Sequence, residues 1–263
     1  MTNSISDKPV IIAVRTGSSR FPDKALAPLG DSSLIEFLLH RLSTIIPIDH
    51  ICIATTVSEP DDRLESMALN IGAKCFRGSV DDVLIRICDA ANYMNCSSFI
   101  EILGDNPFID TDLLFDLNSL FDTSECGYVA TATKEYNDTL YPGPRFPVGT
   151  RSQIISTSSF IQSSKLAFDP YYREHATSFI IENGSLFGVK LLYAKNKYAA
   201  CSRPDLSFAV NVPANLRLCN LIHKICAVSN PNYGLLDVLK CFDDHPEFSK
   251  LMGNNALLDD HLI

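Results

Sequence analysis

A cationic stretch at residues 15–24 is the first part of the chain whose composition suits chemistry. It reads RTGSSRFPDK, so Arg15, Arg20 and Lys24 fall within ten residues of a chain whose net charge is −9. It follows the apolar run 10–14, which predicts a buried strand. Cationic side chains beside exposed backbone N–H groups can hold phosphate oxygens. The stretch lacks the GxxxxGK[ST] and GxGxxG patterns, and composition alone fits a solvated surface loop equally well.

A carboxylate follows a second predicted strand. Asp105 lies in the turn GDNP, directly after the apolar run 99–103. Mg²⁺ binds through one or two carboxylates together with substrate phosphates, so this side chain is a candidate metal ligand. Taken alone, the turn fits an ordinary helix cap somewhat better.

A third polar turn, RGSVDD at residues 77–82, joins a predicted strand to a predicted helix. Asp81 and Asp82 suit the positive end of the helix dipole and can cap its first N–H groups. This capping explains the two carboxylates and leaves Arg77 and Ser79 to face a ligand.

These turns are positioned by a regular alternation of predicted strands and helices over the first 133 residues. The alternation predicts an α/β fold, a mostly parallel twisted sheet with helices on both faces. Ligands bind at the carboxyl ends of the strands in such sheets, so the loops after residues 14, 55, 76 and 103 are the ones of interest. Strands are expected at residues 10–14, 51–55, 74–76, 98–103 and 128–132, and helices at 32–46, 60–70, 81–93 and 110–121.

The pattern changes after residue 134. Residues 135–147 contain four prolines or glycines and no clear period, which predicts an excursion from the core sheet. We expect a single α/β domain over residues 1–263 with an inserted acceptor or dimerisation segment at about 135–200. An apolar strand at 208–212 and a helix from Pro213 to about residue 228 would return to the core, followed by one or two helices at the domain edge.

Composition excludes several classes of protein. There are 22 basic and 31 acidic residues without a basic run, so no nucleic-acid partner is expected. No apolar run is long enough to span a membrane, and the first nine residues do not form a signal peptide. The nine cysteines form no CxxC pair, which predicts free thiols in a reducing cytoplasm.

Taken in order, these stretches resemble the sugar-acid cytidylyltransferases, enzymes that activate 3-deoxy-manno-octulosonate and N-acylneuraminate. The family pattern R-x-x-S-x-R-x-P-x-K is matched by Arg15, Ser18, Arg20, Pro22 and Lys24. The spore-coat polysaccharide branch is the closer resemblance, with motifs in the same order over roughly residues 10–225. They are FRGSVDDVL at 76–84, GDNPFID at 104–110, REHAT at 173–177 and the segment 208–216.

The resemblance implies that an acceptor oxygen attacks the α-phosphorus of CTP and that pyrophosphate leaves. It also implies a small anionic acceptor such as a sugar acid, Mg²⁺ as cofactor and a homodimer that completes the acceptor site. His175 is almost as well explained as a structural hydrogen-bonding residue. The implied residues are Arg15, Ser18, Arg20 and Lys24 for the triphosphate, Arg77 and Ser79 for the base, Asp105 and Asn211 for the metal, and Arg173 and His175 for the acceptor. Arg15, Lys24 and Asp105 are the implied catalytic residues.

The chain departs from the family pattern at three places. Asp23 replaces a glycine and would bring a negative charge into the phosphate loop. Asn211 replaces a second metal-binding aspartate, which would weaken Mg²⁺ binding. Arg151 stands where an acidic residue is common, which favours a more anionic acceptor or a reduced activity.

Two alternatives remain beside the CTP-dependent transferase. Asp23 and Asn211 are consistent with a nucleotide-binding homologue that has lost turnover. A glycosyltransferase that uses a nucleotide-sugar donor would share the sheet, and it would carry an Asp-x-Asp metal motif at a strand end. The GDNP turn lacks that motif, although Asp110-Thr111-Asp112 imitates it at the start of a helix.

Overall fold

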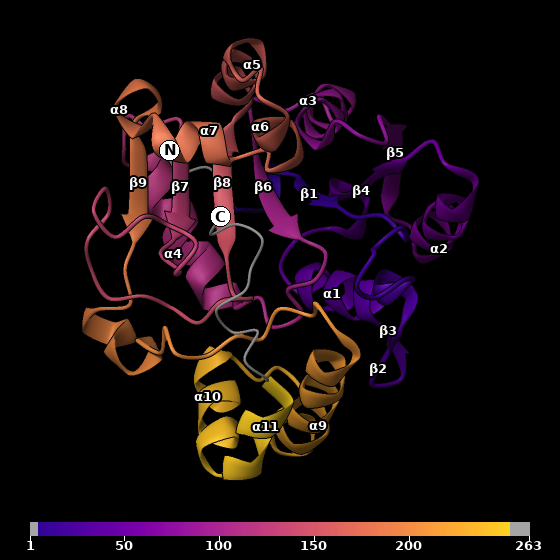
Figure 1. The fold of residues 1–263 in the computed structure, drawn as a ribbon, viewed down its shortest axis with the longest axis vertical. Coiled ribbons are helices and arrows are strands. Elements are labelled where there is room, and N and C mark those ends of the chain that lie inside the picture. Colours follow the sequence, from indigo (N-terminus) through magenta and orange to yellow (C-terminus); the bar gives the residue numbers. More distant parts are fainter. Residues whose placement is uncertain (1–4, 253–263) are drawn as a thin grey trace.

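The structure is a computed structural model that describes residues 5–252, and a seven-stranded sheet forms its centre (Figure 1). The strand order is β5-β4-β1-β6-β8-β7-β9, and every neighbouring pair is parallel except the two pairs made by β8. The expected mostly parallel α/β sheet is therefore confirmed. The strands are β1 (Val10–Ala13), β4 (Ile51–Thr56), β5 (Lys74–Gly78), β6 (Ser98–Leu103), β7 (Tyr128–Thr131), β8 (Ser152–Ser156) and β9 (Val189–Leu192).

Helices cover both faces of the sheet because successive strand residues point to opposite sides. On β1, Val10 and Ile12 pack into one apolar cluster and Ile11 packs into another. The first cluster lies under α1 (Leu34–Ser43), α2 (Asp62–Ile71) and α4 (Thr111–Asp122). The second lies under α3 (Val83–Tyr93), α5 (Thr157–Leu166), α7 (Ser178–Glu182) and α8 (Gly184–Phe187), with the short α6 (Pro170–Glu174) beside them.

Side-chain caps set where the helices begin. Helix α1 starts two residues later than expected, because Ser33 is its N-cap and forms a reciprocal capping box with Glu36. Ser32 and Ser33 also pair with the chain before them, as β3 (Ser32–Ser33) beside β2 (Pro28–Leu29). Asp82 and Asp110 are the N-caps of α3 and α4, and each side chain accepts a hydrogen bond from one backbone N–H, which confirms the capping role predicted for Asp82.

Residues 135–200 do not leave the core sheet as expected. They contribute β8, which inserts between β6 and β7, and β9, which forms one edge of the sheet. The intervening helices α5–α8 pack on the face that carries α3 (Figure 1). The irregular composition that suggested an excursion belongs only to the loop before β8, where the chain turns back to run antiparallel to β6.

The strand expected at residues 208–212 is also absent. That segment is extended, but it lies between two loops and not beside a strand. Its backbone hydrogen bonds are isolated, from Phe208 N to Val148 O at 2.8 Å and from Val210 N to Asp105 O at 2.9 Å. The apolar run is buried because it supports the loop after β6, and an apolar run alone does not distinguish this from a strand.

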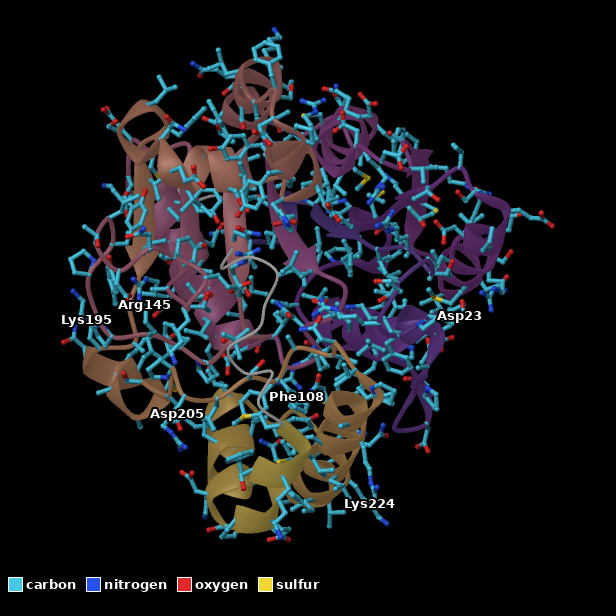
Figure 2. The ribbon with its side chains drawn as sticks, in the orientation of Figure 1. Asp23, Phe108, Arg145, Lys195, Asp205 and Lys224 are labelled. Atoms are coloured by element: carbon cyan, nitrogen blue, oxygen red, sulfur yellow. The ribbon has the colours of Figure 1, made fainter. Side chains whose placement is uncertain are left out.

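A third apolar cluster lies below the sheet, around α9 (Pro213–Ser229) and α10 (Leu235–Asp243), with α11 (Ser249–Met252) beside them (Figure 1). Phe108 joins this cluster to the loop after β6, since its ring lies 5.8 Å from that of Phe208 and 6.1 Å from that of Tyr233 (Figure 2). The helix expected from Pro213 is confirmed. No helix within residues 5–252 is long and apolar enough to cross a membrane.

Candidate active site

A cavity of about 910 Å³ lies at the carboxyl ends of β1 and β6, which is near the upper end of the range for ligand pockets. Its wall is formed by the loop after β1, the turn after β6 and residues of α6 and α7. Two of the four loops expected to bind a ligand therefore meet in this cavity. The loops after β4 and β5 do not contribute residues to its wall.

The cationic loop and the predicted metal ligand face each other across one end of this cavity. Arg15, Ser18, Arg20 and Lys24 all line it, as does Asp105. The Lys24 ammonium lies 2.7 Å from the Asp105 carboxylate and donates a second hydrogen bond, at 3.0 Å, to the carbonyl of the extended segment behind it. The structure thus brings together side chains that are 81 positions apart in sequence.

A buried carboxylate outside the cavity holds this loop in place. Asp61 precedes α2 and accepts hydrogen bonds from Thr16 N at 2.8 Å and Thr16 Oγ1 at 2.6 Å. Its other oxygen accepts from the backbone and the hydroxyl of Thr56, at the end of β4. Burial raises the pKa of Asp61, but the hydrogen bonds from Thr16 and Thr56 outweigh it and the pKa is lowered overall. The carboxylate therefore stays charged and links the loops after β1 and β4.

Asp23 does not bring its charge into the phosphate loop. It adopts a left-handed backbone conformation with φ 57°, which explains why glycine suits this position. Its carboxylate forms an ion pair with Arg63 of α2, and it is not among the residues that line the cavity. Figure 2 shows Asp23 on the side of the molecule that carries α2. The expectation that Asp23 brings a negative charge into the phosphate loop is therefore wrong.

Asp105 and Asn211 are placed where they could share a metal ion, because both line the cavity and both contact cations of the same loop, Lys24 and Arg20. Asn211 also accepts a hydrogen bond of 3.5 Å from Arg20, and its backbone N–H is held by Asn215 at 3.2 Å. One carboxylate and one amide oxygen suit Mg²⁺ when substrate phosphates supply further ligands. Within residues 5–252 no group of three His, Cys, Asp or Glu side chains forms a cage made of protein alone.

Arg77 and Ser79, which the resemblance assigns to the base, lie outside the cavity wall. The Arg77 guanidinium is engaged with Asp62 at 2.5 Å and Glu65 at 2.9 Å, and it also donates to two backbone carbonyls. The Ser79 hydroxyl accepts from the backbone of Asp82 at 3.1 Å. These contacts tie β5 to α2 and shape the start of α3, so both residues are placed to support the fold.

Arg173 is likewise held away from the cavity. Its guanidinium pairs with Asp82 at 2.5 Å and donates to the carbonyl of Ser164 at 2.8 Å, which joins α6 to α3 and α5. His175 does line the cavity, and the centroid of its ring lies 4.6 Å from that of Tyr171, another wall residue, with the two ring planes tilted by 54°. Of the two residues assigned to the acceptor, the structure therefore brings only His175 to the site.

Arg86 lines the cavity although the sequence analysis does not single it out. It is 2% exposed, its Nη1 donates to the Ser79 carbonyl at 2.6 Å, and its Nε has no hydrogen-bond partner among the described residues. Burial and the neighbouring charge of Arg15 lower its pKa to about 10. A lone cation inside the otherwise apolar helix start VLIRIC is the signal that could have found it.

A further part of the cavity wall is formed by carboxylates around one buried arginine. Arg151 of the loop before β8 lies 3.4 Å from Glu135, and Glu101 of β6 faces the same space. Burial raises the pKa of Glu101 to about 7, although the charge of Arg151 opposes this. The positive charge of Arg151 is thus engaged within the protein, so it does not favour the more anionic acceptor expected from the sequence.

The sheet topology and the cavity at the carboxyl ends of its strands are those of the nucleotide-diphospho-sugar transferase fold. The model of the cytidylyltransferase family matches residues 9–200. The chain therefore belongs to the cytidylyltransferases.

Individual relatives agree with this assignment. The chain is 32% identical over 203 residues to the spore coat polysaccharide biosynthesis protein SpsF of Bacillus subtilis, covering 74% of this chain and 79% of that protein. It is 32% identical over 179 residues to protein MJ1063 of Methanocaldococcus jannaschii, covering 68% and 69%. Among solved structures, a cytidylyltransferase from Leptospira borgpetersenii shares the fold with a TM-score of 0.79, at 22% identity over 94% of this chain and 97% of that one.

Proposed function

We propose that the protein transfers the cytidylyl group of CTP to an oxygen of a sugar acid or related anionic acceptor, for surface polysaccharide or glycoconjugate synthesis. The acceptor oxygen forms a bond to the α-phosphorus, the bond from that phosphorus to the bridging oxygen breaks, and pyrophosphate leaves. Such a transfer needs in-line positioning and neutralisation of charge more than covalent help. Membership of the cytidylyltransferase family and the similarity to SpsF support this proposal.

The observation that carries the proposal is the cluster of cations at one end of the cavity. Arg15, Arg20 and Lys24 would bind the triphosphate, and the Ser18 hydroxyl would donate to a phosphate oxygen. Arg86 would add a further positive charge beside Arg15, since it makes no salt bridge within residues 5–252. His175, which also lines the cavity, would contact the acceptor.

Asp105 and Asn211 would hold a Mg²⁺ ion at the phosphate end. When bound, the ion would neutralise charge on the phosphate oxygens. Lys24 lies beside the same carboxylate and so adds a fixed positive charge at this point. Replacement of an aspartate by Asn211 lowers the negative charge of the donor set, which predicts a weaker metal site than two carboxylates would form.

The direct test is pyrophosphate release from CTP and Mg²⁺ with a panel of sugar acids and phosphorylated acceptors. The proposal predicts release that depends on CTP, on the metal and on an acceptor. Calorimetry provides the independent check, because absence of CTP binding would contradict the proposal at its first step.

A catalytically impaired homologue is the second candidate, and Asn211 is the observation in its favour. It predicts CTP binding without pyrophosphate release. The Asp23 charge no longer supports it, because Arg63 pairs with that carboxylate outside the cavity. The glycosyltransferase alternative loses its metal motif, since Asp110 is buried and caps two helices through Leu113 N at 3.0 Å and Leu235 N at 2.6 Å.

We further propose that the protein is a homodimer in a reducing, cytoplasmic compartment. Phe168, which follows α5, is 84% exposed and Leu166 is 43% exposed, so this segment offers apolar surface to a second copy. All nine cysteines are free thiols, as a reducing compartment requires. Light scattering tests the dimer: a monomer at micromolar concentration would contradict it.

A further inference from the structure

Both side chains proposed to bind Mg²⁺ are in contact with cations of the loop at residues 15–24. The Lys24 ammonium lies 2.7 Å from Asp105 Oδ2 and also donates to the carbonyl of Val210 at 3.0 Å. Nη2 of Arg20 donates at 3.5 Å to Asn211 Oδ1, the amide oxygen that would coordinate the ion. The proposed metal donors are therefore also the hydrogen-bond acceptors of cations proposed to bind the triphosphate.

The fold holds these contacts in place. Val210 N donates to the Asp105 carbonyl at 2.9 Å, so the segment that carries Asn211 lies against the turn after β6. Lys24 bridges the two, because one ammonium binds the side chain of Asp105 and the backbone of the segment. The Lys24 side chain is 17% exposed and that of Asp105 is 25% exposed. An ion pair that is largely shielded from water is harder to separate than a surface pair.

Mg²⁺ would compete with Lys24 for the same carboxylate. The ion binds oxygen at about 2.0–2.1 Å, so on Asp105 it would lie only a few ångströms from the ammonium. The charge of Asp105 is too small to neutralise both cations, and the amide of Asn211 brings no charge. Within residues 5–252 no group of three His, Cys, Asp or Glu side chains is placed to hold a metal ion. Binding of the metal before the nucleotide is therefore opposed by repulsion between like charges.

A triphosphate would remove this repulsion. Arg20 and Lys24 line the same cavity as Asp105 and Asn211, so phosphate oxygens can accept from the two cations. Asp105 and Asn211 would then be released to coordinate the ion, and further phosphate oxygens would complete its ligands. In this exchange the ammonium passes from a carboxylate to a phosphate and the metal takes its place. Every negative group keeps a cation, and no covalent bond changes.

We propose that the cationic loop controls the metal site: Mg²⁺ binds strongly only after the triphosphate of CTP has drawn Lys24 and Arg20 away from Asp105 and Asn211. This inference rests on the proposed function and adds the order in which its ligands bind. A preformed metal site would behave in the opposite way, because the ion would bind first and attract the nucleotide. Here the metal alone meets donors that are already engaged, whereas metal-free CTP meets cations that can turn to it.

The test measures the binding of metal and of nucleotide separately, with the full chain and without turnover. Mn²⁺ stands for Mg²⁺, since both prefer oxygen ligands, and the loss of its free-ion signal in electron paramagnetic resonance reports binding. The nucleotide is α,β-methylene CTP, which cannot release pyrophosphate, and it is titrated by calorimetry in EDTA. We expect the unaltered protein to bind this analogue without a metal.

Lys24→Met removes the competing ammonium and keeps most of the length of the side chain. Without nucleotide, the variant should bind Mn²⁺ at least about fivefold more tightly than the unaltered protein, the lower limit usual for coupled sites. It should bind the metal-free analogue at least about fivefold more weakly, because a phosphate-binding charge is lost. A residue with only a structural role would lower both affinities, so the opposite directions identify the exchange.

Lys165→Met, at an exposed position outside the cavity, is the matched control and should change neither affinity. Addition of Asp105→Asn to Lys24→Met should abolish the gain in Mn²⁺ binding, which places the gained ion at Asp105. Equal or weaker Mn²⁺ binding by Lys24→Met would overturn the inference. So would a gain that survives the loss of the Asp105 charge.

The inference and the proposed function fail in distinguishable ways. If the analogue binds neither in EDTA nor with Mg²⁺, the proposed function fails and the order of binding falls with it. If the analogue binds with Mg²⁺ but not in EDTA, only the inference fails. If Lys24→Met does not fold, the titrations of the unaltered protein still decide: binding of the analogue in EDTA supports the inference, and tight binding of Mn²⁺ alone overturns it.

Discussion

Asp61 accepts both the backbone N–H and the hydroxyl of Thr16, at 2.8 and 2.6 Å, so one buried carboxylate fixes the first turn of the cationic loop. It lies 45 positions further along the chain, and its other oxygen is bonded to the end of β4. The loop that presents Arg15 to the cavity is therefore held by a residue that does not itself line the cavity.

Asp61→Asn should weaken the protein and its binding of CTP together. The substitution replaces one carboxylate oxygen of Asp61 by an amide NH2 group. Each of these oxygens accepts from a backbone N–H and a hydroxyl, so the NH2 group would face two donors, which costs about 1–3 kcal/mol of unfolding free energy. Urea denaturation measures the loss, and the KM for CTP should rise more than kcat falls. Glu59→Gln, an exposed neighbour, is the control and should leave both unchanged. An unaltered KM for CTP would show that Asp61 does not position the loop.

Asp23→Gly should leave pyrophosphate release within about twofold of the unaltered rate, because the carboxylate pairs with Arg63 and does not face the ligand. Asp23→Val places a β-branched side chain at φ 57° and should cost roughly 1–2 kcal/mol of stability. Kinetics and thermal unfolding of the two variants check these outcomes. A large gain of activity in the glycine variant would instead show that the Asp23 charge acts on the phosphates.

Lys24→Met should lower kcat/KM by about 100-fold or more, because a fixed charge at the phosphate end is lost from a site that acts by electrostatics. Lys24 also neutralises Asp105. The activity of the variant should therefore rise more steeply with Mg²⁺ concentration than the activity of the unaltered enzyme. Steady-state kinetics over a range of Mg²⁺ concentrations measures both effects, with Lys165→Met outside the cavity as control. A change below threefold would contradict the role of Lys24.

Asn211→Asp should lower the Mg²⁺ concentration needed for half-maximal activity, because a second carboxylate strengthens the donor set. The positive charge of Arg20 stabilises the added negative charge, since Arg20 already donates a hydrogen bond of 3.5 Å to the Asn211 side chain. A metal titration of CTP-dependent turnover compares the two proteins. If the unaltered protein binds CTP without turnover and the variant gains activity, the impaired homologue is the correct description.

The stability of the protein should fall between about pH 4.5 and pH 7 because of Glu101. Its pKa is raised from 4.5 to about 7 in the folded chain by burial, so unfolding releases a proton in this window. Unfolding free energy then decreases as the pH rises, by an amount on the order of 3 kcal/mol for a shift of this size.

Glu101→Gln removes that proton release, so the variant should gain stability relative to the unaltered protein between pH 5 and pH 8. The midpoint of urea unfolding, measured at pH 5 and at pH 8, gives the gain in stability, and the control variant Glu125→Gln should show no gain. Parallel pH profiles for the Glu101 variant and the unaltered protein would rule out a raised pKa for Glu101.

The sequence by itself predicted five strands of the sheet, β1, β4, β5, β6 and β7, and the loops at their carboxyl ends. The strand predicted at residues 98–103 matches β6 in full, because its apolar residues are a local signal, and the cap at Asp82 is another. The order of the motifs then identified the family, because the residues of a ligand-binding loop keep a fixed local spacing.

Only the tertiary structure decided which polar residues face the ligand. Asp23 and Arg77 lie within motifs, yet Arg63 and the acidic residues of α2 engage their charges outside the cavity. Arg86 and Glu101 lie in apolar elements, yet they line the cavity wall. The direction of a side chain and the partner of a charge depend on elements distant in sequence. Local spacing therefore predicts the loop, and packing selects the residues that complete the site.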